Sequence, residues 1–190
     1  ESIVDEFTEK LIGKVKELKV GNGFDEDTVV GPLIDDSALR KVSNHVDEAV
    51  EKGANVLLGG RILTEDDYAK GNFYAPTVLN NVSKEMLIYK EETFGPVAPI
   101  ITFSSEEELL TMINHEQYGL ASYLYTNDMS RTIRMMEKME YGIIGINDPI
   151  PFVVQGPFGG LKESGIGKEG SHYGIDDYIE KKLVSVRFKK

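Results

Sequence analysis

The sequence predicts an α/β fold in which a largely parallel open sheet is flanked by helices. Between about residues 55 and 146, short apolar runs typical of buried strands alternate with segments whose apolar residues recur at helical spacing. The connections between these segments are short, which favours parallel strands with helices on the faces of the sheet. A chain of 190 residues is also long enough to bury a substantial core.

Four segments are predicted to be helices from the spacing of their apolar residues. They cover about residues 3–19, 36–52, 105–115 and 127–138. The last three begin with side chains that can accept hydrogen bonds from the first free amides of a helix. These candidate caps are Asp35 or Asp36, Ser104 or Ser105, and Asn127 or Asp128. Within the second helix, we expect His45 to lie on the polar side.

Five segments are predicted to be extended: residues 55–58, 73–79, 97–103, 121–125 and 142–146. Pro76 indicates an edge or irregular strand for the second of them, because proline cannot donate to a sheet ladder. Residues 148–174 are rich in glycine and lack apolar periodicity, which predicts long ordered loops of the kind that usually serve function. Residues 183–188 alternate apolar and polar side chains, and we predict a half-buried strand with nothing after it to cover it.

Composition excludes several functional classes. A formal net charge of −11 disfavours nucleic acid and anionic membranes as partners. Cysteine is absent, so no disulfide, thiolate nucleophile or cysteine-ligated zinc is possible, and a reducing cytoplasm is the expected location. No apolar run is long enough to span a bilayer. The first residues start inside a helical pattern without a methionine, which suggests a fragment of a longer protein.

Two adjacent carboxylates, Glu91 and Glu92, precede the apolar run that begins at Val97. Carboxylates in such a place are most often simply solvated. At the entry to a strand of an open α/β sheet, however, an ionised carboxylate can accept hydrogen bonds from the two hydroxyls of a ribose. Phe94 would face the same side as Glu92 in an extended chain and could pack against a flat ring.

Other motifs are weaker evidence of chemistry. Residues 165–170 fit the pattern G-x-G-x-x-G, but no buried strand precedes them, so tight turns explain the glycines better than a dinucleotide site. In residues 157–160, PFGG, Phe158 could anchor the loop in a pocket or core, but an ordinary turn with a buried aromatic is the favoured explanation on local evidence. His45, His115 and His172 lack the spacing of metal ligands, and we expect no metal site.

Several long motifs together resemble the NAD(P)-dependent aldehyde dehydrogenase superfamily. The family's E-x-F-G-P signature is matched at residues 92–96, and PFGG-x-K-x-S-G-x-G-[RK]-E is matched at 157–170. Further matches are GPLI at 31–34, NFYAPTVL at 72–79 and YIEKK at 178–182. The segment KEGSHYGIDDYIEKK is similar to succinate-semialdehyde dehydrogenases.

This resemblance implies a fold and a reaction. The fold would be the aldehyde dehydrogenase catalytic domain, followed by a C-terminal strand that pairs with a neighbouring subunit. In the intact enzyme a cysteine thiolate attacks the aldehyde, hydride passes to NAD or NADP, and a glutamate-activated water releases the acid. The cysteine, the glutamate base and the Rossmann domain would all precede Glu1. We therefore expect no catalytic residue in this chain and no activity from it alone.

The resemblance also assigns residues and boundaries. Glu92 matches the position that binds the nicotinamide-side ribose, Phe94 matches the residue that packs near the nicotinamide, and Glu91 is left as the solvated neighbour. The aldehyde would contact three residues, Phe152, Val153 and Phe158. The expected regions are an α/β core at 1–147, the substrate-tunnel and glycine-rich loops at 148–177, and an oligomerisation strand at 178–190 that forms a dimer or tetramer. The alternative is a non-catalytic oligomerisation or binding module.

Overall fold

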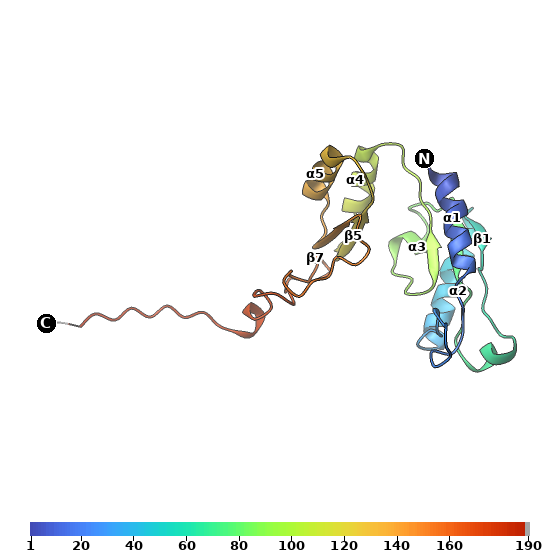
Figure 1. Ribbon diagram of the computed structural model, residues 1–190, viewed down its shortest axis with the longest axis horizontal. Coiled ribbons are helices and arrows are strands. Elements are labelled where there is room, and N and C mark those ends of the chain that lie inside the picture. The colour runs from blue at the N-terminus through green and yellow to red at the C-terminus, as the bar shows by residue number, and fades with distance from the viewer. Residues whose placement is uncertain (189–190) are drawn as a thin grey trace. The chain divides into compact units, whose positions relative to one another are not determined.

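Helices and short strands are distributed along residues 1–188, the part of the chain that the computed structural model describes (Figure 1). Contacts divide the chain into two compact units, the first covering Glu1–Ser104 and the second starting at Ser105. Unit 1 contains α1 (Val4–Lys16), α2 (Asp36–Glu51), β1 (Asn55–Leu58), the 3-10 helix η1 (Asp66–Lys70), β2 (Thr77–Asn80), α3 (Leu87–Lys90) and β3 (Val97–Pro99). Unit 2 contains α4 (Glu106–Asn114), β4 (Tyr118–Gly119), β5 (Ala121–Leu124), α5 (Met129–Lys138), β6 (Ile143–Ile146), β7 (Leu161–Lys162) and the 3-10 helix η2 (Asp176–Tyr178).

The sheet of unit 1 has the order β1-β2-β3 and mixes strand directions. β2 runs parallel to β3 but antiparallel to β1, so the prediction of a largely parallel sheet is wrong for this pair. A parallel pair needs a crossover of a dozen or more residues, usually a helix, and residues 59–76 hold only η1. Of the two alternatives predicted from Pro76, an edge strand is wrong, because β2 is central, whereas an irregular strand agrees with the register shift in its pairing with β1. Its ladder begins at Thr77, one residue after the proline.

The core of unit 1 forms where α2 packs on the sheet. Val42, Val46 and Ala49 of α2 are buried together with Tyr74 and Leu79. The predicted cap is confirmed, since the Asp35 carboxylate accepts from the Ala38 amide at 2.7 Å and satisfies one free donor of the helix.

His45 belongs to this buried face of α2. Only 1% of its surface is exposed, so its predicted place on the polar side is wrong. The physical reason is helical spacing: His45 follows Val42 by three residues and precedes Ala49 by four, which puts all three on one face.

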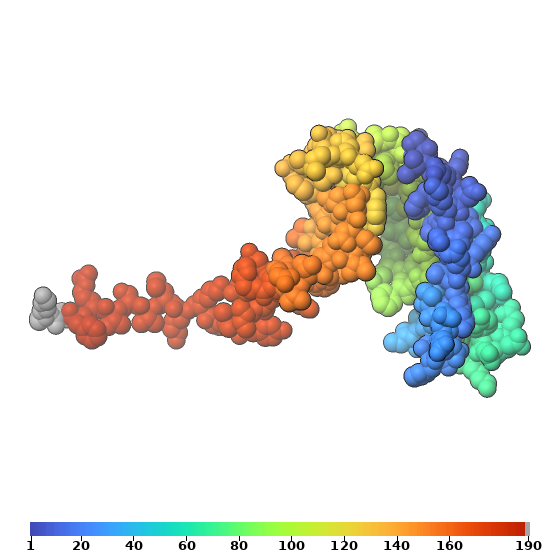
Figure 2. Space-filling model, in the orientation of Figure 1, coloured from blue at the N-terminus to red at the C-terminus, as the bar shows by residue number. Residues whose placement is uncertain are grey.

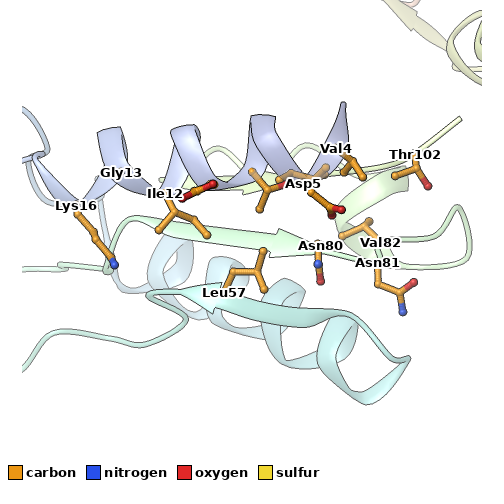
Figure 3. Close-up of a pocket in the computed structure, with 13 residues that line it drawn as sticks. Val4, Asp5, Ile12, Gly13, Lys16, Leu57, Asn80, Asn81, Val82 and Thr102 are labelled. Carbon is orange, nitrogen blue, oxygen red and sulfur yellow. The ribbon is translucent and has the colours of Figure 1, made fainter. Parts of the chain in front are cut away.

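α1 packs more loosely than α2. None of its residues is buried, and a cavity of about 840 Å³ lies between this helix and the sheet. Figure 3 shows the lining side chains, with Ile12 of α1 and Leu57 of β1 on opposite sides of the cavity. Neither residues 91–96 nor residues 148–158 contribute to its lining.

Unit 2 is built on a β-α-β arrangement. β5 and β6 pair in parallel and α5 connects them, as the alternation in the sequence predicts. Ser105 and Asp128 cap α4 and α5 by accepting from amides of the first turn. Glu106 of α4 bridges Arg131 and Arg134 of α5, and the hydrogen bond from Arg131 is the largest influence that lowers the pKa of Glu106.

Residues 179–188 form no helix or strand, and they extend away from the rest of unit 2 (Figure 2). Leu183 and Phe188 are almost fully exposed, and Val184 and Val186 are about two-thirds exposed. A strand at 183–188 is thus not seen in the single chain, and its pairing with a second subunit stays a prediction.

Candidate functional site

The turn that contains Glu92 and Phe94, residues 91–96, connects α3 to β3 and is fixed at both ends. The Glu91 amide donates to the Leu87 carbonyl at 2.8 Å, which closes the last turn of α3. At the other end, the Pro96 carbonyl accepts from the Thr77 amide of β2 at 2.8 Å. The turn is therefore anchored in the sheet and lies at the start of a strand, where the sequence places it.

The underside of the turn rests on α2. A Cβ atom added at Gly95 would lie 2.5 Å from Cγ2 of Val42, so only glycine allows this close approach. The Thr93 hydroxyl lies 3.1 Å from Nδ1 of His45. Thr93 and Gly95 thus hold the turn against the buried face of α2.

The outer side of the turn presents the two candidate cofactor residues. Glu92 is exposed, and no described residue forms a hydrogen bond or ion pair with its carboxylate. Phe94 is 76% exposed and has a left-handed backbone with φ of 49°. The extended geometry assumed from the sequence therefore fails at Phe94. For a residue other than glycine this conformation costs on the order of 1–3 kcal/mol, and such strain concentrates at ligand sites.

Glu91 has a contact that the sequence did not reveal. More than half of its side chain is exposed, which fits a solvated neighbour, but its carboxylate also lies 3.4 Å from Nε2 of His45. Both ring nitrogens of His45 therefore face the same turn, one toward Thr93 and the other toward Glu91.

The three candidate substrate residues lie around one cavity of unit 2. Phe152, Val153 and Phe158 line a space of about 320 Å³ together with Ile143 and neighbouring loop residues. The rings of Phe152 and Phe158 meet edge to face with centroids 5.5 Å apart, a favourable aromatic geometry. All three side chains keep at least 40% of their surface exposed, so they remain available to a ligand.

Backbone contacts fix the loops around this cavity. Phe158 and Glu169 exchange two hydrogen bonds, of 2.8 and 2.7 Å, which tie the two arms of the glycine-rich segment together. The Lys168 ammonium donates to the Gly160 carbonyl at 2.6 Å. In the described part of the chain no α-helix opens after residues 165–170, where only the short 3-10 helix η2 follows, and the strand before them, β7, has two residues, so these glycines serve tight turns, as the sequence favours.

The structure thus brings the candidate residues together in two sets. Glu92 and Phe94 share one turn of unit 1, and Phe152, Val153 and Phe158 share one cavity of unit 2. Among residues 1–188, no group of three or more histidines, aspartates or glutamates is arranged to hold a metal ion. None of the helices described in this range is both long and apolar enough to cross a bilayer.

Comparison with known proteins identifies the family. The model of the aldehyde dehydrogenase family matches residues 1–184, and the chain belongs to that family. The glutarate-semialdehyde dehydrogenase of Pseudomonas putida is 48% identical over 186 residues, which are 98% of this chain and 38% of that protein. The NADP(+) succinate-semialdehyde dehydrogenase of Escherichia coli is 44% identical, over 98% of this chain and 38% of its own length.

Solved structures agree with the sequence relatives. An aldehyde dehydrogenase of Brucella melitensis superposes with a TM-score of 0.92 at 46% identity, covering 99% of this chain and 38% of that one. A betaine aldehyde dehydrogenase of Staphylococcus aureus, solved in complex with NAD+, gives a TM-score of 0.88 at 39% identity, over 94% of this chain and 36% of that one. The chain therefore spans well under half the length of the relatives it matches.

Proposed function

We propose that this chain is part of an enzyme that oxidises an aldehyde to a carboxylic acid with NAD+ or NADP+. The observation that carries the proposal is the turn 91–96, which presents an unpaired carboxylate and an exposed aromatic ring from a backbone fixed on three sides. Relatives whose names specify semialdehydes favour a semialdehyde as the substrate.

The exposed groups of the turn suit the nicotinamide half of such a cofactor. The Glu92 carboxylate offers only acceptors, which matches the two hydroxyl donors of a ribose. Phe94 offers an apolar ring face against which a flat heterocycle packs. When bound, the cofactor accepts the hydride, and this chain contributes orientation of the ribose and ring.

The cavity around Phe152, Val153 and Phe158 suits the apolar part of an aldehyde. Among the described residues that line it, Glu169 is the only charged one, and a carboxylate there repels the acid group of a semialdehyde. We therefore assign the cation that would recognise this acid group to another part of the enzyme.

The nucleophile, the general base and the cofactor-binding Rossmann domain are assigned to polypeptide outside these 190 residues. The chain has no cysteine and cannot form the thioester of the family reaction. We therefore propose that the chain by itself is inactive.

A third contribution is assembly. The exposed apolar side chains of residues 183–188 and their unpaired backbone suit addition of a strand to a second copy, giving a dimer or tetramer. The proposed regions are 1–147, 148–177 and 178–190, and the proposed location is the cytoplasm. The alternative function, a non-catalytic oligomerisation module, would also use this tail. It would not explain the exposed carboxylate and aromatic ring of the turn 91–96, which therefore favour the enzyme.

The test is turnover of the full-length enzyme with semialdehydes and either cofactor, with and without Glu92→Gln. We expect measurable reduction of NAD+ or NADP+, and about a tenfold rise in the cofactor KM for Glu92→Gln, because a neutral amide replaces a charged acceptor. Gln keeps the size of the side chain at an exposed site, so the melting temperature should stay unchanged. No oxidation of any aldehyde would contradict the proposal, and normal kinetics in Glu92→Gln would remove Glu92 from the cofactor site.

A further inference from the structure

His45 is a buried titratable group that the family assignment leaves without a role. It is 1% exposed and stands in the apolar face of α2, between Val42 and Val46. A buried imidazole that lacks partners is costly, so a core position of this kind is normally filled by an apolar side chain. In this chain the position holds an imidazole, and both of its nitrogens lie close to side chains of the turn 91–96.

Each of the two ring nitrogens has a partner in the turn. Nε2 lies 3.4 Å from Oε2 of Glu91, within ion-pair distance. Nδ1 lies 3.1 Å from the Thr93 hydroxyl, which can both donate and accept and therefore suits either tautomer of the ring. One ring thereby engages the two residues that flank Glu92.

The same face of α2 makes a second contact with the turn, between Val42 and Gly95. This glycine meets Val42, one helical turn before His45, and together the two contacts bracket Phe94. Phe94 has the left-handed backbone of the turn, a conformation that persists only where its surroundings determine it.

We propose that His45 is a positioning residue for the cofactor half-site: it locks the turn 91–96 so that Glu92 and Phe94 are presented to the nicotinamide ribose and ring. The inference rests on the proposed function of that turn. His45 touches neither cofactor nor aldehyde in this account, and it acts through Thr93 and Glu91.

The test uses the full-length enzyme and three variants. His45→Leu replaces the imidazole with an apolar side chain of similar volume and so removes both nitrogens. For this variant we expect roughly a tenfold rise in the cofactor KM and a lower kcat, while the aldehyde KM should change less than about twofold. His45→Asn keeps a polar group near the position of Nδ1 and should recover cofactor KM to within about threefold. Thr93→Val removes only the contact with Nδ1 and should reproduce part of the loss. Adding Thr93→Val to His45→Leu should change little, because His45→Leu has already removed that contact.

Val46→Ala is the matched control, since Val46 is equally buried on α2 and is apolar. It should lower the melting temperature and leave the cofactor KM unchanged. If His45→Leu lowers the melting temperature but keeps normal kinetics, while Glu92→Gln is impaired, His45 is only a core residue and the inference fails alone. If the unsubstituted enzyme oxidises no aldehyde, the proposed function fails and this inference falls with it.

Discussion

The two units differ in how they bury their apolar residues. Among residues 1–188, unit 1 holds all but three of the buried apolar side chains, centred on Val42, Val46 and Leu79. In the described part of unit 2, residues 105–188, only Met135, Met139 and Ile143 reach that degree of burial. Unit 2 instead exposes apolar side chains along its loops and tail, including Phe152, Val154, Ile166, Ile175, Leu183 and Phe188.

This difference shows which part of the chain is self-sufficient. The candidate cofactor turn has the core of unit 1 beneath it, so its conformation is determined by contacts within this chain. The candidate substrate loop has little core beneath it, and many of the large apolar side chains of the loops and tail of unit 2 are exposed. We therefore propose that unit 2 gains its final packing from the remainder of the enzyme or from a second subunit.

The largest expected effect is on catalysis by the 190-residue chain alone. We expect no NAD(P)H formation with any aldehyde, because no thiolate is available to form the covalent intermediate. Absorbance at the reduced-nicotinamide band, with the full-length enzyme as the positive control, measures this. Turnover by the isolated chain would show that it carries a complete active site.

The next largest expected effect is on stability, and it contrasts a core residue of unit 1 with a half-exposed apolar residue of unit 2. Leu79→Ala removes a fully buried side chain of unit 1 and should lower the free energy of unfolding by about 2–5 kcal/mol. Leu161→Ala in unit 2 removes a side chain that is 42% exposed and should cost less than about 1 kcal/mol. Urea unfolding of the chain, followed by circular dichroism, compares them. Equal losses would mean that the half-exposed Leu161 contributes as much to packing as a core residue of unit 1.

Much of this architecture could be predicted from local sequence. Three helix starts followed from Asp35, Ser105 and Asp128, because capping depends on residues only a turn apart. The α/β class and the β5-α5-β6 connection followed from periodicity and short loops. The carboxylates before the strand at Val97 drew attention to Glu92 and Phe94, and the family resemblance assigned their roles.

The failures have two kinds of cause. The direction of β1 against β2 and the burial of His45 had local signals that were misjudged, namely the lack of a crossover helix in residues 59–76 and the helical spacing of His45 with Val42 and Ala49. The contacts of His45 with Thr93, 48 residues away, and with Glu91 have no local signal, because they form only when α2 packs against the turn. β4 and β7 are two-residue strands, and α3 is four residues long, so none of the three has enough length for a periodic signal. The Phe94 backbone shows the same limit, because Gly95 and Val42 meet only in the folded state.

An intermediate effect separates two glycines of unit 1. Gly95→Ala forces a methyl group against Val42, a stiff and fully buried side chain, and should cost about 1–3 kcal/mol of stability. Gly13→Ala lies within α1 with nothing inside 4 Å, and should stabilise by about 0.5–1 kcal/mol. Denaturant unfolding of both variants is the measurement. A neutral Gly95→Ala would mean that the turn does not rest on α2.

The smallest expected effect separates the two halves of the site. In the full-length enzyme, Phe152→Ala should raise the aldehyde KM roughly threefold to tenfold and leave the cofactor KM unchanged, because it removes apolar contact with substrate only. Phe94→Ala should show the opposite pattern. Steady-state kinetics with each substrate varied in turn makes the comparison, and matching effects of the two variants on both constants would contradict the division of roles.

The most direct test of the account is a crystal structure of the full-length enzyme with NAD+ or NADP+ bound. We predict that the Glu92 carboxylate accepts hydrogen bonds of about 2.6–3.2 Å from the hydroxyls of the nicotinamide-side ribose, with Phe94 beside the ring. A cofactor that binds without contact to Glu92, leaving the carboxylate in solvent, would contradict it.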